Sequence, residues 1–336
     1  MLNTISGMLG GFTAAIAEYL GIGHQTSPFI ATYPWSSSSG YGTKYSDPAS
    51  IPPGQGYGVS FNPAGTNILS VNGSSPFLAA YPWSPGFGTR YADPAAGLNQ
   101  LDQGNFNHNG TAVAAGGPFS PYIYAYAFSS GFGTKFTNPA SLPNGGTNAI
   151  WNSAGTNIAL GGAASPYVHA WAWSSGFGTK YSNPATLPTG YSNNVGWNPA
   201  GTAIGVSHAN SPFVSTYPWS SGFGTKYANP ATLPSGGTNA IAWSPDGNTV
   251  ALGETTSPYV CAYPWSAGFG TKYSAPATLP TGQANGIGFN KLGNAVTVAH
   301  TTNPFVTSYP WSAGFGTKYA NPATLPTSTG WAVSFA

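Results

Sequence analysis

Residues 240–280 read AIAWSPDGNTVALGETTSPYVCAYPWSAGFGTKYSAPATLP, and this stretch holds one complete copy of a repeating unit. It begins with an apolar run at 240–243. The turn Ser244-Pro245-Asp246-Gly247 follows, where proline at the second position and glycine at the fourth favour a tight reversal. Three further strand-like segments come after the turn, at 249–252, 259–263 and 269–274. The stretch therefore predicts four short antiparallel β-strands.

The same unit recurs along the whole chain. A Ser/Asn-Pro-aromatic triplet occurs seven times at spacings of 45 to 48 residues, with its proline at Pro28, Pro76, Pro121, Pro166, Pro212, Pro258 and Pro304. Seven residues after each proline stands a large aromatic residue: Trp35, Trp83, Phe128, Trp173, Trp219, Trp265 and Trp311. Gly and Pro recur too often for helices, whereas four strands in about 40–45 residues are typical of one blade of a β-propeller.

The repeat predicts an all-β fold, a single seven-bladed β-propeller at 18–336 with four antiparallel strands per blade, preceded by an N-terminal arm at 1–17. The last segment, 331–335, matches the innermost strand at 58–61, and nothing after it matches a second strand. The chain opens instead with a second strand at 19–23. We therefore expect 331–335 to lie beside 19–23 and to close the ring, which would leave no blade with an open end.

Composition excludes several classes of function. Only 14 of the 336 residues are charged (eight Lys or Arg and six Asp or Glu), so the chain lacks the basic surface that nucleic-acid binding needs. No apolar run of about 20 residues is present, which argues against membrane insertion. The many aromatic residues (11 Trp, 20 Tyr and 18 Phe) exclude a disordered Gly/Pro-rich chain and predict aromatic packing between blades.

The segment Ala240–Trp265 resembles a WD40 blade: a strand, a Ser-Pro-Asp-Gly turn, a second strand, and a third strand that ends in Trp. The Gly-His pair and the Trp-Asp pair of that family are missing, so the resemblance is one of shape. The sequence of the repeats, as in YPWSSGFGTKYANPATLPSG at 217–236, resembles propeller proteins of tailed bacteriophages. This resemblance implies a virion protein.

Seven of the eight basic residues occupy one repeat position, which symmetry places on the outermost strands: Lys44, Arg90, Lys135, Lys180, Lys226, Lys272 and Lys318. One interpretation is protection, because lysine on an edge strand prevents pairing with other chains. The alternative is a cationic belt that meets acidic partners or sugars.

Four residues before four consecutive prolines of the ring stand His208, Glu254, His300 and His24. The pattern predicts that they start the loops between second and third strands, at equal heights on four neighbouring blades. They would form a polar rim that binds a partner, or they are solvated loop residues. Equivalent Cα atoms would be roughly 8–9 Å apart given a strand spacing of ~4.8 Å. Two imidazoles could share a metal at that distance, but four ligands could not converge easily, so we expect no metal there.

No catalytic group emerges from the spacing. Asp47 and Asp93 stand where other units have Asn before proline, so they are turn formers, and Asp246 belongs to a turn between strands. Asp102 and Glu18 are isolated along the chain. We therefore expect no enzymatic activity and no cofactor.

These observations predict a non-enzymatic structural or attachment component of a bacteriophage virion, located in the virion and acting as a protein-interaction or decoration module. Its partners would be other virion proteins, bound through the N-terminal arm and a propeller face. The alternative is a lectin-like propeller that binds host glycans through repeated Tyr, Trp and Asn side chains. A propeller hydrolase or lyase is the third interpretation, and it lacks the clustered acids expected of it.

Overall fold

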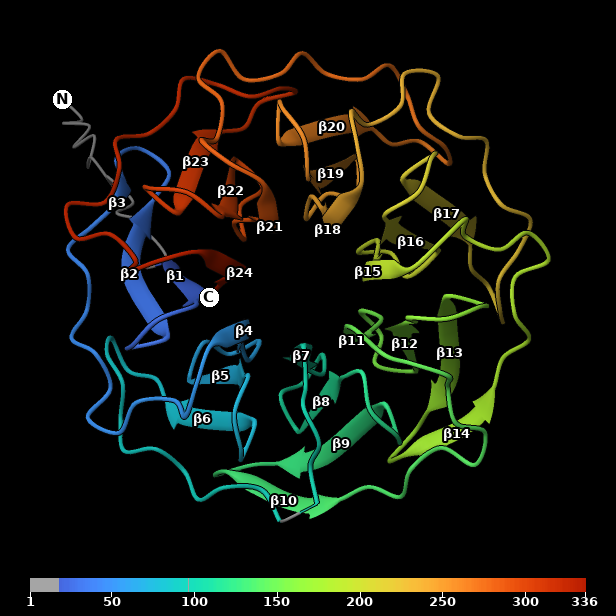
Figure 1. Ribbon diagram of the computed structural model, residues 1–336, viewed down its shortest axis with the longest axis horizontal. Helices are drawn as coiled ribbons and strands as arrows, with labels where there is room; N and C mark the ends of the chain where they lie inside the picture. Colours follow the sequence, from blue (N-terminus) through green and yellow to red (C-terminus); the bar gives the residue numbers. More distant parts are fainter. Residues whose placement is uncertain (1–17, 96) are drawn as a thin grey trace, which may run out of the picture.

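The computed structural model describes residues 18–95 and 97–336, and these residues form seven β-sheets of three or four antiparallel strands each. The sheets stand around a common centre, so the described part of the chain has a β-propeller-like fold (Figure 1). The expected N-terminal arm, 1–17, lies outside the described residues. No helix in the described part is long and apolar enough to cross a membrane.

Each sheet has an innermost, a second and a third strand, and three sheets have an outer strand as well. The innermost strands are β4 (Gly56–Phe61), β7 (Gln103–Phe106), β11 (Ala149–Trp151), β15 (Ser192–Trp197), β18 (Thr238–Trp243), β21 (Ala284–Phe289) and β24 (Gly330–Phe335). The second strands are β1 (Glu18–His24), β5 (Asn67–Asn72), β8 (Ala112–Gly116), β12 (Asn157–Gly161), β16 (Ala203–His208), β19 (Thr249–Glu254) and β22 (Ala295–His300). The third strands are β2 (Ile30–Ser36), β6 (Leu78–Pro82), β9 (Ile123–Phe128), β13 (Val168–Trp173), β17 (Val214–Pro218), β20 (Val260–Pro264) and β23 (Val306–Pro310). The outer strands are β3 (Gly40–Tyr41), β10 (Phe132–Lys135) and β14 (Phe177–Lys180).

The expectation of four strands in every sheet is wrong for four sheets, in which the outer segment makes one isolated bridge, such as Trp265↔Phe269. The residue before the large aromatic separates the two four-residue outer strands from the other five sheets, in which the outer strand is absent or, as in β3, only two residues long. It is Ala127 or Ala172 beside the four-residue outer strands β10 and β14, and proline in every other sheet. Proline has no N–H to donate to an outer strand, so regular pairing stops there.

The aromatic residues at the ends of the third strands form the core between sheets, as the repeat predicts. Trp265 is 7% exposed, and its ring meets Trp243 of the same sheet edge to face, with centroids 4.8 Å apart. Phe269 of the same unit and Tyr227 of the preceding unit contact it in the same way, at 5.2 and 5.1 Å. Edge-to-face pairs of this kind stabilise a protein beyond the apolar area that they bury.

The two ends of the described chain share one sheet. β24 pairs antiparallel with β1, and the register joins Leu20 to Phe335 and Ile22 to Val333. Each innermost strand also contacts the innermost strands of both neighbouring sheets. The inner strands pack closely; a Cβ on Gly286, for example, would lie 2.7 Å from the carbonyl oxygen of Trp331.

Candidate functional site

The innermost strands place one side chain from each sheet around a cavity at the centre of the molecule. We call it the mouth cavity. Its volume of about 380 Å³ falls within the range of small-molecule sites. The seven side chains share one repeat position, four residues before the aromatic residue that ends each innermost strand: Tyr57, Asp102, Thr147, Asn193, Asn239, Asn285 and Trp331. Because this position differs between sheets, the mouth cavity has an amide-rich side and an aromatic side.

Three consecutive sheets supply the amide-rich side, which we call the amide arc: Asn193, Asn239 and Asn285. Each Nδ2 donates a hydrogen bond of 2.9–3.0 Å to a backbone carbonyl oxygen of the next innermost strand, at Thr238, Ala284 and Gly330. Nδ2 of Asn193 and Nδ2 of Asn239 also lie 3.3 and 3.5 Å from Oδ1 of the next asparagine. The arc joins neighbouring sheets, and its amide oxygens keep lone pairs that a ligand hydroxyl can use.

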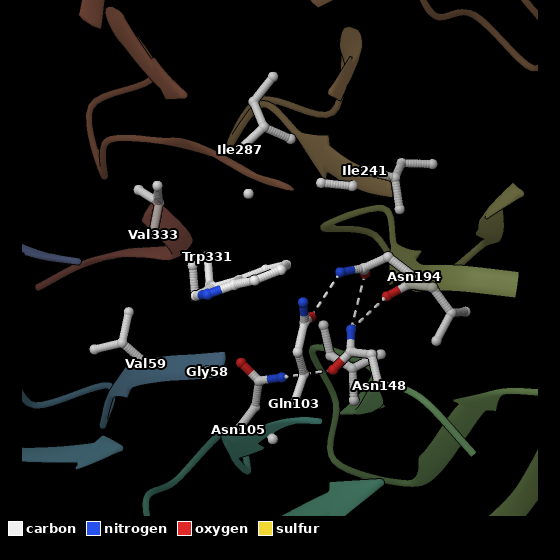
Figure 2. A pocket seen from close by; sticks show the side chains of 16 residues that line it. Gly58, Val59, Gln103, Asn105, Asn148, Asn194, Ile241, Ile287, Trp331 and Val333 are labelled. Atoms are coloured by element: carbon white, nitrogen blue, oxygen red, sulfur yellow. Dashed lines mark hydrogen bonds between the residues drawn. The ribbon is translucent and has the colours of Figure 1, made fainter. Parts of the chain in front are cut away.

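A second amide network lies deeper, around a cavity of about 160 Å³ (Figure 2). Asn105 donates to Asn148 at 3.3 Å, Asn148 to Asn194 at 2.8 Å, and Asn194 to Oε1 of Gln103 at 2.8 Å. Gln103 and Asn105 both belong to β7, so the bonds run from β7 through β11 and β15 and back. Because Oε1 of Gln103 is held in this way, its Nε2 is directed toward the axis and Trp331 (Figure 2).

Tyr57 and Trp331 form the aromatic side of the mouth cavity. Their rings meet edge to face, with centroids 5.6 Å apart and an interplanar angle of 81°. Trp331 also lines the deeper cavity. Its Nε1–H is buried and has no acceptor within the described residues. A ring-shaped ligand on the axis would therefore meet an apolar surface on this side.

Asp102, directly before β7, is the one acidic residue among those that line the two cavities. Burial disfavours the charged carboxylate and raises the pKa of Asp102 to about 6. The pKa values of Tyr57 and Tyr191 are raised by burial and, to a lesser extent, by the Asp102 charge. A carboxyl group that titrates near neutral pH beside a cavity is suited to general acid–base chemistry.

The expected polar rim is wrong in position, because His24, His208, Glu254 and His300 are fully buried. They are the last residues of the second strands β1, β16, β19 and β22, rather than the first residues of solvated loops. Whether they take part in binding stays a prediction.

The three histidines of this group tie their strands to neighbouring segments. Nδ1 of His208 donates to the carbonyl oxygen of Asn210 at 2.8 Å, and Nε2 accepts from the Ser215 hydroxyl at 3.0 Å. His300 makes the equivalent contact with Thr307 at 3.0 Å, and His24 contacts Thr327 at 3.2 Å. Burial disfavours the imidazolium form and lowers the pKa of all three histidines to about 4.

Glu254 replaces histidine at this position in one sheet. Its Oε1 accepts from the backbone N–H of Ser235 at 2.9 Å and lies 3.8 Å from Nζ of Lys272. Cys261 stands where the two adjacent sheets have Ser215 and Thr307, and burial together with the Glu254 charge raises the pKa of its thiol. This sheet therefore holds a buried carboxylate paired with a partly exposed lysine where its neighbours hold an imidazole and a hydroxyl.

The seven basic residues of the outer position fold back onto the protein. Lys44 pairs with Asp47 and Arg90 with Asp93, and their side chains are 12% and 16% exposed. Lys226 and Lys318 contact Asn229 and Asn321 in the same way. Lys135 lies 4.8 Å from the centre of the Tyr124 ring. Burial lowers the pKa of Lys180, Lys226 and Lys318.

Asp102 is isolated along the sequence, and Tyr57, Trp331 and the amide arc belong to no motif, so none of them was predicted as a site residue. The signal was available: aligning the units on the aromatic end of the innermost strand shows that the position four residues earlier changes from unit to unit. Among residues 18–95 and 97–336, no group of three His, Cys, Asp or Glu side chains could hold a metal ion.

Comparison with known proteins establishes the fold. No protein-family model and no curated protein sequence matches the chain. A solved structure from Bacteroides fragilis, provisionally named 6-phosphogluconolactonase, is similar with a TM-score of 0.76 and 12% identity, over 96% of this chain and 99% of that one. The periplasmic gluconolactonase of Pseudomonas aeruginosa gives 0.72 and 11%, over 95% and 99%. A Lactobacillus plantarum protein gives 0.73 and 13%, over 96% and 100%. These similarities support the β-propeller-like fold.

The expectation of a non-enzymatic virion component with a virion location is wrong. The three structural neighbours are bacterial proteins, and two of them carry the names of lactonases. No neighbour supports the phage resemblance, and the lectin-like alternative gains no support from them either.

Proposed function

We propose that the chain forms a closed seven-bladed propeller whose mouth cavity hydrolyses a small lactone. Two observations support the closed ring: the pairing of β24 with β1, and the unbroken circle of contacts between innermost strands. In such a ring, with the sheets arranged around the centre (Figure 1), a ligand on the axis would contact several sheets at once. The names of two structural neighbours make lactone opening the reaction to test first.

Asp102 supplies the acid–base chemistry. Its carboxylate takes a proton from water while the water oxygen bonds to the lactone carbonyl carbon, which gives a tetrahedral oxyanion. The ring C–O bond then breaks, and the Asp102 carboxyl returns the proton to the departing ring oxygen. The product is the open hydroxy acid, so atoms and charges balance with water as the one co-reactant.

Gln103 is placed to stabilise the oxyanion. Asn194 holds Oε1 of Gln103 at 2.8 Å, and this bond directs the Nε2 donor toward the axis. A donor fixed before the reaction begins needs little reorganisation when charge develops on the lactone oxygen. Gln103 follows Asp102 in the chain, so donor and base belong to one short segment.

One observation carries this proposal: Asp102 lines the mouth cavity with a pKa raised to about 6. At neutral pH such a carboxyl is mostly ionised and is a stronger base than an ordinary aspartate. The rate should therefore rise with pH through an apparent pKa near 6 and then level off, because the deprotonated form is the active one.

The test is the opening of glucono-1,5-lactone by the full chain, followed with a pH indicator and corrected for the uncatalysed reaction. Asp102→Asn should lower the rate by roughly 10²- to 10⁴-fold, the usual contribution of general acid–base catalysis. Asp246→Asn, in a turn between two strands, is the matched control and should keep the full rate. A wild-type chain that gives no acceleration, or an Asp102→Asn variant with the full rate, would contradict the proposal.

A further inference from the structure

The charged side chains near the axis are acidic, and the basic ones lie elsewhere. Seven of the eight Lys and Arg residues lie at the outer repeat position, and the eighth, Lys291, contacts the carbonyl oxygen of Pro63 at 3.4 Å. Within 18–95 and 97–336, no Lys, Arg or His lines the mouth cavity or the deeper cavity. Asp102 therefore brings a negative charge to the site, and no basic side chain balances a second one.

A phosphate group would be costly in such a place. It carries about −1.5 to −2 charges near pH 7 and is normally met by arginine, lysine or a helix N-terminus. The mouth cavity offers amides, two tyrosines and a tryptophan, and the strands around it supply no helix N-terminus. Transfer of a phosphate from water to this cavity would lose hydration without gaining a cation, and it would add repulsion from Asp102.

The same lining suits hydroxyl groups. The amide arc presents three carbonyl oxygens on one side of the cavity, each with lone-pair capacity left after its contact with the neighbouring sheet. Tyr57 and Trp331 face the ligand from the other side with an apolar surface. Hydroxyls on one edge and C–H groups on a face are the features of a sugar-like ring.

We propose that the mouth cavity selects an uncharged, polyhydroxylated ring of monosaccharide size and rejects the phosphorylated form of the same ring. This inference rests on the proposed function for the location of the site, and it chooses between the two kinds of substrate in the names of the structural neighbours. Asn193, Asn239 and Asn285 are its specificity-determining residues.

The test is calorimetric titration of the full chain with gluconolactam, a neutral ring that water does not open, and with gluconolactam 6-phosphate. The wild-type chain should bind the neutral lactam at least tenfold more tightly than the phosphate. Asn239→Lys should reduce this preference at least tenfold by placing a cation in the amide arc, and Asn193→Lys repeats the test on the adjacent sheet. Ala164→Lys, which adds the same charge to the exposed loop between β12 and β13, is the control and should leave the preference unchanged.

The outcomes separate this inference from the proposed reaction. Equal binding of the two lactams, tighter binding of the phosphate, or no binding of either one would overturn the selection. Tight binding of the neutral lactam without any opening of the lactone would leave the selection standing and refute the hydrolysis. Opening of glucono-1,5-lactone and its 6-phosphate at equal rates would leave the hydrolysis standing and refute the selection.

Discussion

The periphery and the axis of this molecule are built from the same repeating unit, but the residues are alike from unit to unit at the periphery and differ from unit to unit at the axis. At the third strands each unit ends in Trp or Phe, packed by the same edge-to-face contacts. Around the mouth cavity the equivalent positions hold three asparagines and then Trp331, Tyr57, Asp102 and Thr147. Uniform residues suit a ring of identical interfaces, whereas a small ligand without sevenfold symmetry needs a lining that varies. We therefore propose that the periphery stabilises the molecule and that the axis recognises the ligand.

The largest effect should come from removing a peripheral tryptophan. Trp265→Ala is expected to lower the free energy of unfolding by about 3–5 kcal/mol, because the ring is 7% exposed and leaves a cavity between two sheets. Trp331→Ala should cost about 1 kcal/mol or less while abolishing lactam binding, because this ring borders a cavity that exists already. Urea unfolding and lactam titration of both variants measure the two effects. Equal losses of stability in the two variants would contradict the division between a stabilising periphery and a recognising axis.

The next effect concerns the one sheet that departs from the peripheral pattern. Glu254→Ala should lower the free energy of unfolding by about 3 kcal/mol, because Lys272 loses its buried partner. The double variant Glu254→His with Cys261→Ser restores the arrangement of His208 and Ser215 and should recover most of that loss. If the double variant is no more stable than Glu254→Ala in the same urea assay, the equivalence between sheets is wrong.

The buried histidines should make the periphery sensitive to acid. Their pKa is about 4 in the folded chain and near 6.5 in the unfolded chain, so the unfolded state binds more protons between these values. Stability is therefore full above pH 6.5 and declines as the pH falls to 4, by up to about 1.4 kcal/mol per pH unit for each histidine.

His208→Asn tests this acid sensitivity, because Asn72 occupies the same position in another unit. The melting temperature of the variant should depend less steeply on pH between 4 and 6.5, because one of the three buried histidines that contribute to the slope is gone. The exposed His108, changed to Asn, is the control and should leave the slope unchanged. An unaltered slope in His208→Asn would show that the imidazole does not stay neutral in the folded chain.

The smallest effect has the opposite sign and belongs to the axis. Asp102 has a raised pKa, so above pH 6 its charge is less favourable in the folded chain than in the unfolded chain. Asp102→Asn should therefore raise the free energy of unfolding at pH 8 by about 1 kcal/mol while removing the lactone-opening activity. At pH 4 the gain should vanish, because the carboxyl is then protonated in the folded state. A variant that is less stable at pH 8 would mean that Asp102 is a structural residue.

Much of the fold could be predicted from the sequence because the repeat is nearly perfect at the positions that build it. The regular spacing of the Pro28 to Pro304 series predicted the seven sheets, and the match between 331–335 and 58–61 predicted the pairing of β24 with β1. The missing outer strands had a signal that was overlooked, since a proline such as Pro264 removes the N–H that an outer strand needs.

The site was harder to predict because its residues are unremarkable in the chain around them. Asp102 is one acidic residue without a neighbour of its kind, and Tyr57 and Trp331 lie 274 residues apart. The contact between β24 and β4 brings them together, and it depends on the position within the unit rather than on any motif. The histidines were placed at the right strand end, but their burial depends on the covering loops, whose packing the repeat does not show.

A crystal structure of the full chain with bound gluconolactam would test the central claim most directly. We expect the lactam in the mouth cavity, with its hydroxyls on the amide arc, a ring face against Tyr57 or Trp331, and its carbonyl near Asp102 and Gln103. A lactam bound at the outer strands, repeated from sheet to sheet with the mouth cavity free of it, would contradict the division between a stabilising periphery and a recognising axis.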